Sequence, residues 1–144
     1  MYGTLGGIVQ KKINAKNLMA KKIVRAMARG AVVLDENLAN LAEGLRNHNI
    51  HVLTVPTKMK DEEIKRVYLT RRLFITNNPA HFIDDASSYE YGIISTRKIK
   101  YKGEDQLVPL LSKALSKHNL WSRTYGFIIE LDEKGDGEIK PLQS

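Results

Sequence analysis

Cysteine is absent from the 144 residues of the chain, which excludes disulfides, thiolate metal sites and cysteine nucleophiles. The sequence also lacks any run of 18 apolar residues, the length at which a membrane-spanning helix would be predicted. No apolar signal-peptide core follows the first residues, so we expect no secretory signal. These absences fit a reducing compartment, and we expect a cytoplasmic protein with no membrane partner.

Acidic residues are missing from positions 1–34, where seven of the 23 Lys and Arg residues lie. The remaining 16 basic residues are balanced by all 16 acidic residues, so the net charge of +7 belongs to the N-terminal segment. Positive charge that is segregated in this way predicts a polyanionic partner, either nucleic acid or an acidic surface.

An amphipathic helix is predicted from about Ile13 to Arg29, within an N-terminal extension of residues 1–30. Apolar side chains fall on one arc of this helix. The basic residues of the opposite arc are Lys21, Lys22, Arg25 and Arg29. One interpretation is that the apolar arc packs on the following domain and the basic face is merely solvated. The others are that the basic face contacts phosphates or a partner protein.

Apolar runs rich in β-branched residues alternate with helical patterns over residues 31–144, which we take as one domain. Strands are predicted at 31–35, 51–55, 72–76, 91–95 and 125–131, with a segment at 138–140 that pairs back. Helices are predicted at 37–47, from residue 61 onwards, and from just after Glu104 to a close at residues 118–119. The alternation predicts an α/β fold with a mostly parallel central sheet, helices on both faces and an antiparallel C-terminal edge.

Polar side chains collect in pairs near the strand ends. The pairs are Asp35 and Glu36, Asp61 and Glu62, Asn77 and Asn78, and Asp84 and Asp85. The carboxyl ends of parallel strands share one sheet edge, where α/β proteins bind ligands. Oxygen ligands from separate strand ends, without cysteine or clustered histidine, suit Mg²⁺ or Mn²⁺. The alternative is that each acid caps its own helix. For Asp35 considered alone, the helix cap is the favoured interpretation.

Several motifs follow one another in a characteristic order along the chain. They read Val-Val-Leu-Asp-Glu-Asn-Leu at 32–38, a leucine-rich helix, His-Val-Leu-Thr-Val at 51–55, Asp-Glu-Glu-Ile at 61–64 and Arg-Leu-Phe-Ile-Thr at 72–76. The tail adds Tyr-Gly-Ile-Ile at 91–94, a helix, Gly-Phe-Ile-Ile-Glu at 126–130 and a terminal hairpin. This order resembles the small PIN-like domains, a family of predicted nucleases of toxin–antitoxin systems. The resemblance covers about residues 31–142 and implies a PIN-like three-layer fold, preceded here by the basic N-terminal helix.

The resemblance also implies a site for metal-dependent cleavage of RNA by a water molecule. Asp35 would be the central metal ligand, and Asp61 or Glu62 would hold the metal or orient the water. The family pattern Thr-Arg-Asp followed by Asp-Phe reads here as Thr-Asn-Asn at 76–78 and His-Phe at 81–82. Asn78 would therefore offer a neutral oxygen, and Asp84 or Asp85 would compensate for the missing carboxylates.

From these features we expect a Mg²⁺- or Mn²⁺-dependent ribonuclease of PIN-like type, the toxin of a toxin–antitoxin pair. Its partners would be RNA, contacted by the basic helix, and an antitoxin protein, while homo-oligomerisation is left open. The alternative hypothesis is a catalytically degenerate PIN-like module that binds nucleic acid or a partner protein.

Overall fold

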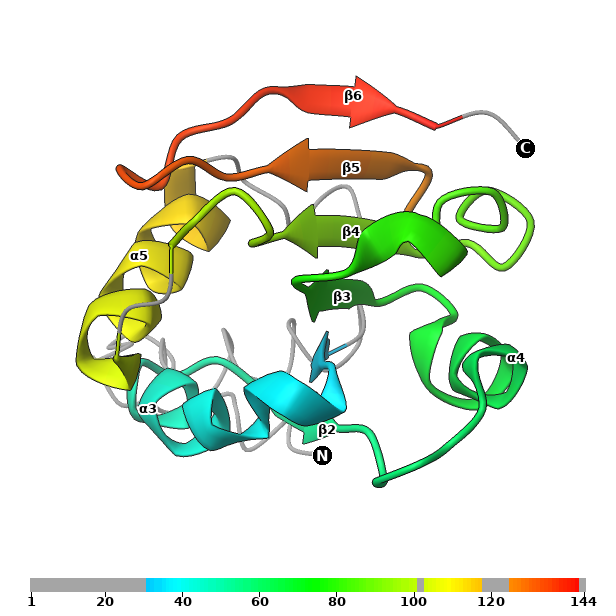
Figure 1. Cartoon of the computed structure of the whole chain (residues 1–144), viewed down its shortest axis with the longest axis horizontal. Helices are drawn as coiled ribbons and strands as arrows, with labels where there is room; N and C mark the ends of the chain where they lie inside the picture. Colours follow the sequence, from blue (N-terminus) through cyan, green and yellow to red (C-terminus); the bar gives the residue numbers. More distant parts are fainter. Residues whose placement is uncertain (1–30, 101–102, 118–124, 143–144) are drawn as a thin grey trace, which may run out of the picture.

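A six-stranded sheet is the centre of the computed structural model, which describes residues 31–100, 103–117 and 125–142 (Figure 1). The strand order is β2-β1-β3-β4-β5-β6. The strands are β1 (Val32–Leu34), β2 (Val52–Thr54), β3 (Leu73–Thr76), β4 (Gly92–Ser95), β5 (Phe127–Glu130) and β6 (Ile139–Pro141). The helix expected over residues 13–29 lies outside the described residues.

The first five strands are parallel, and β6 pairs with β5 in the antiparallel direction. Every residue of β1, β3 and β4 is buried. Strands that are covered on both faces require continuous apolar runs, and this is the pattern that their sequences show. The mostly parallel sheet with an antiparallel C-terminal edge is therefore confirmed.

One face of the sheet is covered by the 3₁₀ helix η1 (Glu36–Leu41) and by helices α3 (Ala42–Asn47) and α5 (Glu104–Lys117), as Figure 1 shows. Alternate strand residues such as Leu34, Ile75 and Ile129 pack there against leucines of the helices. Gly44 of α3 lies so close to α5 that a Cβ atom at this position would come within 2.7 Å of Val108 Cγ2. A glycine thus allows the two helices to approach each other.

The opposite face is covered by α4 (Asp61–Glu63), the π-helix η2 (Ile64–Leu69), the short 3₁₀ helix η3 (Pro79–His81) and the segment that leads to β4. Phe74 packs on Phe82 with ring centroids 4.6 Å apart, within a core that includes Val33, Leu69 and Tyr91. Helical segments therefore pack on each face of the sheet in the described residues. None of the helices in the described residues is long and apolar enough to span a membrane.

Two local predictions need correction at the helix starts. Asp61 was expected to cap its helix, but the cap position is Lys60 and Asp61 is the first helical residue, with no side-chain cap hydrogen bond. The segment after Asp35 begins as a 3₁₀ helix and becomes an α-helix only at Ala42. Hydrophobic spacing cannot separate these helix types because their periods are too close over six residues.

The connection from β4 to β5 runs through α5 and differs in hand from the earlier crossovers. From β1 to β2 the chain passes over the α3 face, and from β2 to β3 it moves in the reverse direction over the η2 face, so these two crossovers share one hand. From β4 to β5 it again moves toward β6, but α5 lies on the α3 face. The β4–α5–β5 unit is thus the exception in a class that is right-handed in about 98% of cases.

At each edge of the sheet, one backbone position that could pair with a further strand is blocked. On β2, Arg46 Nη2 donates to the outward carbonyl of Val52 at 2.8 Å. On β6, Pro141 stands opposite Phe127 and has no N–H to offer.

Candidate ligand crevice at the carboxyl edge of the sheet

The strand order changes direction between β1 and β3. After β1 the chain continues to β2 on one side, and after β3 it continues to β4 on the other side. The loops that follow these two neighbouring strands therefore diverge. In open α/β sheets, such a switch point is where a ligand crevice opens at the carboxyl ends of the strands.

Asp35 directly follows β1 and is held by two donors. Its Oδ1 accepts the Glu36 N–H at 2.8 Å, as a cap of η1, so the capping interpretation of Asp35 is confirmed. Its Oδ2 accepts the hydroxyl of Thr76 at 2.7 Å. The Thr76 hydroxyl in turn accepts the Asn78 N–H at 3.0 Å, which ties the ends of β1 and β3 together.

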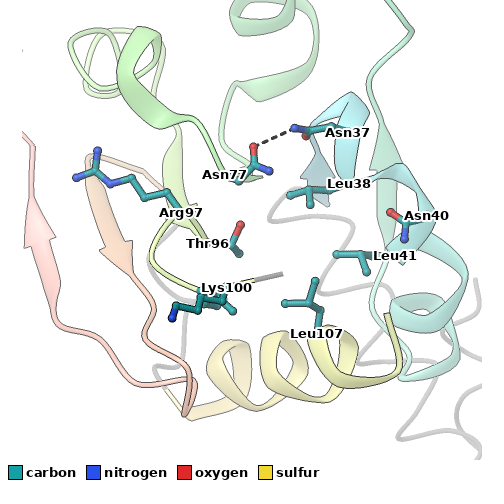
Figure 2. A pocket seen from close by; sticks show the side chains of 10 residues that line it. Asn37, Leu38, Asn40, Leu41, Asn77, Thr96, Arg97, Lys100 and Leu107 are labelled. Carbon is teal, nitrogen blue, oxygen red and sulfur yellow. Dashed lines mark hydrogen bonds between the residues drawn. The ribbon is translucent and has the colours of Figure 1, made fainter. Parts of the chain in front are cut away.

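Two asparagines bridge the same pair of loops above this contact. Asn37 Nδ2 donates to Asn77 Oδ1 at 2.9 Å, and both residues are exposed. Figure 2 shows the bond between these side chains at one end of a hollow. The bond is made by residues 40 positions apart in the sequence, so it depends on the parallel pairing of β1 with β3.

The hollow is a crevice of about 320 Å³, within the size range of small-ligand sites. Its apolar wall is formed by η1, α5 and the loop after β4, through Leu38, Leu41, Leu107 and Ile99 (Figure 2). The unusual placement of α5 on the η1 face is what brings Leu107 to this wall. The polar wall consists of Asn37, Asn40, Asn77 and Thr96.

Two cations, Arg97 and Lys100, complete the lining, and none of the described residues that line the crevice is acidic. Arg97 Nε lies 2.6 Å from Glu130 Oε2, and Arg97 Nη2 donates to Glu130 Oε1 at 3.0 Å. Lys98 lies 3.6 Å from the same carboxylate. Lys100 has no hydrogen-bond or ion-pair partner within residues 31–100, 103–117 and 125–142. The loop after β4 thus carries more positive charge than Glu130 neutralises.

The pKa of Glu130 is lowered by these neighbours. Burial of the side chain by itself raises the pKa, but the hydrogen bond and charge of Arg97, a hydrogen bond from Ser95 and the charge of Lys98 lower it by more. Glu130 is therefore a carboxylate that anchors Arg97 at the crevice.

The other predicted acids belong to a separate network on the η2 face. Lys65 is only 5% exposed, and its Nζ lies 2.6 Å from Asp85 and 3.5 Å from Glu62. Asp61 pairs with His81 at 3.0 Å. Burial lowers the pKa of Lys65, but the hydrogen bond to Asp85 and the charges of Asp85 and Glu62 raise it by more, so its net shift is upward.

The structure thus gives Asp35 different partners from Asp61, Glu62 and Asp85. Asp84 is exposed, and Asn78 contributes its backbone N–H to the Thr76 contact. Over the described part of the chain, no group of three His, Asp or Glu side chains is arranged to hold a metal ion. The Mg²⁺ or Mn²⁺ site stays a prediction, as do the phosphate contacts of Lys21, Lys22, Arg25 and Arg29, which lie outside the described residues.

Of the polar residues that line the crevice, sequence reasoning singled out only Asn77 and missed Asn37, Asn40, Thr96, Arg97 and Lys100. The signal was present, because Thr96 and Arg97 directly follow the fourth predicted strand, and the argument from shared strand ends applies to them as well. Arg97 and Lys100 are basic and cannot bind a metal ion as a carboxylate does, so an argument from metal ligands does not include them. The part played by α5 had no sequence signal, since crossover hand is not encoded in hydrophobic spacing.

Comparison with known proteins finds no matching family model, no matching curated protein and no matching solved structure.

Proposed function

We propose that the chain is a PIN-like module that binds single-stranded RNA at the crevice between η1, the β3 loop and the β4 loop. The observation that carries this proposal is the lining: amides, a hydroxyl and two cations, with no acid among the described lining residues, at the switch point of a parallel sheet. The net charge of +7, which the N-terminal segment carries, favours the same class of ligand for the chain as a whole.

The two halves of the crevice suit the two halves of a nucleotide. Lys100 and the partly neutralised Arg97 supply positive charge for a phosphate. The leucines and Ile99 offer an apolar surface for the face of a base. Asn37 Oδ1 and Asn77 Nδ2 offer hydrogen bonds, whereas Asn40 Nδ2 donates to Glu104 at 3.4 Å. Sequence-independent phosphate contacts account for the affinity of most such complexes.

The test is the affinity of the full chain for a labelled single-stranded RNA, measured by fluorescence anisotropy over a range of salt concentrations. Lys100→Ala removes one phosphate contact, so we expect affinity to fall roughly fivefold at 0.1 M salt and the slope of log K against log salt to shrink by about 0.7. Lys140→Ala, which removes an exposed lysine from β6, is the matched control. Equal behaviour of the two variants would contradict the proposal.

The predicted N-terminal helix is tested in the same assay. Replacing Lys21, Lys22, Arg25 and Arg29 together by Ala should reduce the salt slope by up to about 2.8 if all four contact phosphates. A slope that does not change would leave these residues as a solvated face.

Metal-dependent RNA cleavage by a toxin of a toxin–antitoxin pair is the second candidate function. It is favoured by the position of Asp35, which stands at the carboxyl end of β1 beside the switch point, hydrogen-bonded to Thr76. Each of its oxygens accepts one hydrogen bond, so a lone pair is left on each for a cation.

Cleavage is tested by incubating the protein and RNA with Mg²⁺ or Mn²⁺, beside an Asp35→Asn variant. Asparagine also caps helices well, so this variant can keep the cap while it loses the charge and the oxygen that accepts the Thr76 hydroxyl. Cutting that requires metal and disappears in the variant would establish the enzyme, and the search for an antitoxin would then follow. Binding without cutting would establish the module.

A further inference from the structure

The asparagine pair leaves two hydrogen-bonding groups unused. Asn37 spends its Nδ2 on Asn77 Oδ1, so Asn37 Oδ1 remains as an acceptor and Asn77 Nδ2 remains as a donor. Neither group has another partner among the residues that the structure describes. The pair therefore leaves one acceptor on η1 and one donor on the loop after β3.

These two groups lie at one end of the crevice, beside Leu38 of its apolar wall. Figure 2 shows Asn37 and Asn77 directed toward one another, with Leu38 below them and Thr96 nearby. A flat ligand that rests on Leu38 and Leu107 would turn an edge toward the asparagines. Such a ligand needs an adjacent donor and acceptor on that edge.

We propose that the crevice binds one unpaired nucleobase, with its hydrogen-bonding edge on Asn37 Oδ1 and Asn77 Nδ2. The proposal rests on the proposed function that the crevice binds RNA. Every nucleobase carries a donor beside an acceptor on its Watson–Crick edge, so the chemistry fits the class and selects no single base. Asparagine amides are a common protein partner for base edges.

A selectivity for single strands follows directly. In a duplex the Watson–Crick edges are used by the opposite strand and the bases are stacked, so they cannot reach a pocket of this kind. A mononucleotide, in contrast, brings a free edge, a ring face and a phosphate. Ribose 5-phosphate brings the phosphate alone.

The experiment is a titration of the full chain with adenosine 5′-monophosphate, uridine 5′-monophosphate and ribose 5-phosphate, followed by calorimetry or NMR shifts. Both nucleotides should bind more tightly than ribose 5-phosphate. Asn77→Asp replaces the donor by an acceptor at an exposed position, and its added negative charge repels every ligand that carries a phosphate. The ratio of nucleotide affinity to ribose 5-phosphate affinity is therefore the readout, and it should fall by about 5- to 100-fold. Gln106→Glu makes the same amide-to-acid change on α5 outside the crevice lining, and should leave the nucleotide preference unchanged.

The outcomes separate this inference from the proposed function. If ribose 5-phosphate binds as well as the nucleotides, or if Asn77→Asp and Gln106→Glu behave alike, the base site is wrong. RNA binding that depends on Lys100 would still stand in that case. If neither RNA nor nucleotides bind at the crevice, both proposals fail together.

Discussion

Lys65 shows how a charged residue can be held inside this fold. Its ammonium group lies 2.6 Å from Asp85 and 3.5 Å from Glu62, and 5.5 Å from the centroid of the Phe82 ring. An ammonium group that lies over an aromatic face and meets two carboxylates is a stable way to bury a lysine. The contact links η2 to the segment before β4.

Removing this charge should destabilise the fold. In Lys65→Met the stem still packs, but Asp85 and Glu62 lose their cation, so we expect the free energy of unfolding to fall by about 1–3 kcal/mol. Arg71→Gln is the control, since the Arg71–Glu90 pair lies at the surface and such pairs contribute less than about 1 kcal/mol. Urea unfolding measures both; equal losses would show that burial does not strengthen the Lys65 contact.

At the scale of elements, the approach of α3 to α5 shapes the crevice wall. Gly44 permits this approach, because a Cβ atom there would meet Val108 Cγ2 at 2.7 Å. The two helices must move apart if the space is filled, and Leu107 is carried by the same turn of α5 as Val108. Packing at this contact is therefore linked to the width of the crevice.

Gly44→Ala should lower the free energy of unfolding by about 1–3 kcal/mol through overpacking, despite the better helix propensity of alanine. Val108→Ala alone should also be destabilising, since Val108 is buried and its loss opens a cavity. In the double variant the new methyl group enters that cavity, so the loss of unfolding free energy should be smaller than the sum of the losses in the two single variants. Strict additivity, measured by thermal or urea unfolding, would contradict the close contact.

The elements themselves were largely predictable from the sequence, and their partners were not. Residues 73–76 and 92–95 are short apolar runs that fit a buried strand better than any other element. The helix at 104–117 shows a clear leucine spacing. Asp35 could be placed at a strand end but not beside Thr76, because that contact joins residues 41 positions apart. Lys65 has a charged sequence neighbourhood, and only the tertiary fold buries it.

At the scale of the whole molecule, stability should depend on pH at both ends of the range. The pKa of Glu130 is lowered in the folded state, so its contribution is present above its ordinary value of 4.5 and is lost as pH falls through the lowered value. The pKa of Lys65 is raised, so its contribution is present below the ordinary value of 10.5 and is lost as pH rises through the raised value.

Thermal unfolding measured from about pH 2 to about pH 12 tests this dependence, because this range brackets the ordinary pKa values of carboxylates and lysines. Glu130→Gln should flatten the acid limb only in part, because the backbone N–H groups of Asp136 and Lys134 also lower the pKa of Asp132. Lys65→Met should flatten the alkaline limb. A variant that flattened the wrong limb would contradict the assignment.

The blocked positions at the two sheet edges limit how copies of this chain could associate. An incoming strand at β2 would have to displace the Arg46 guanidinium from the Val52 carbonyl, and at β6 it would meet a proline in place of an amide donor. Growth of the sheet from one molecule into the next is disfavoured at both borders. For the described part of the chain, we therefore expect self-association to use surfaces other than the two sheet edges.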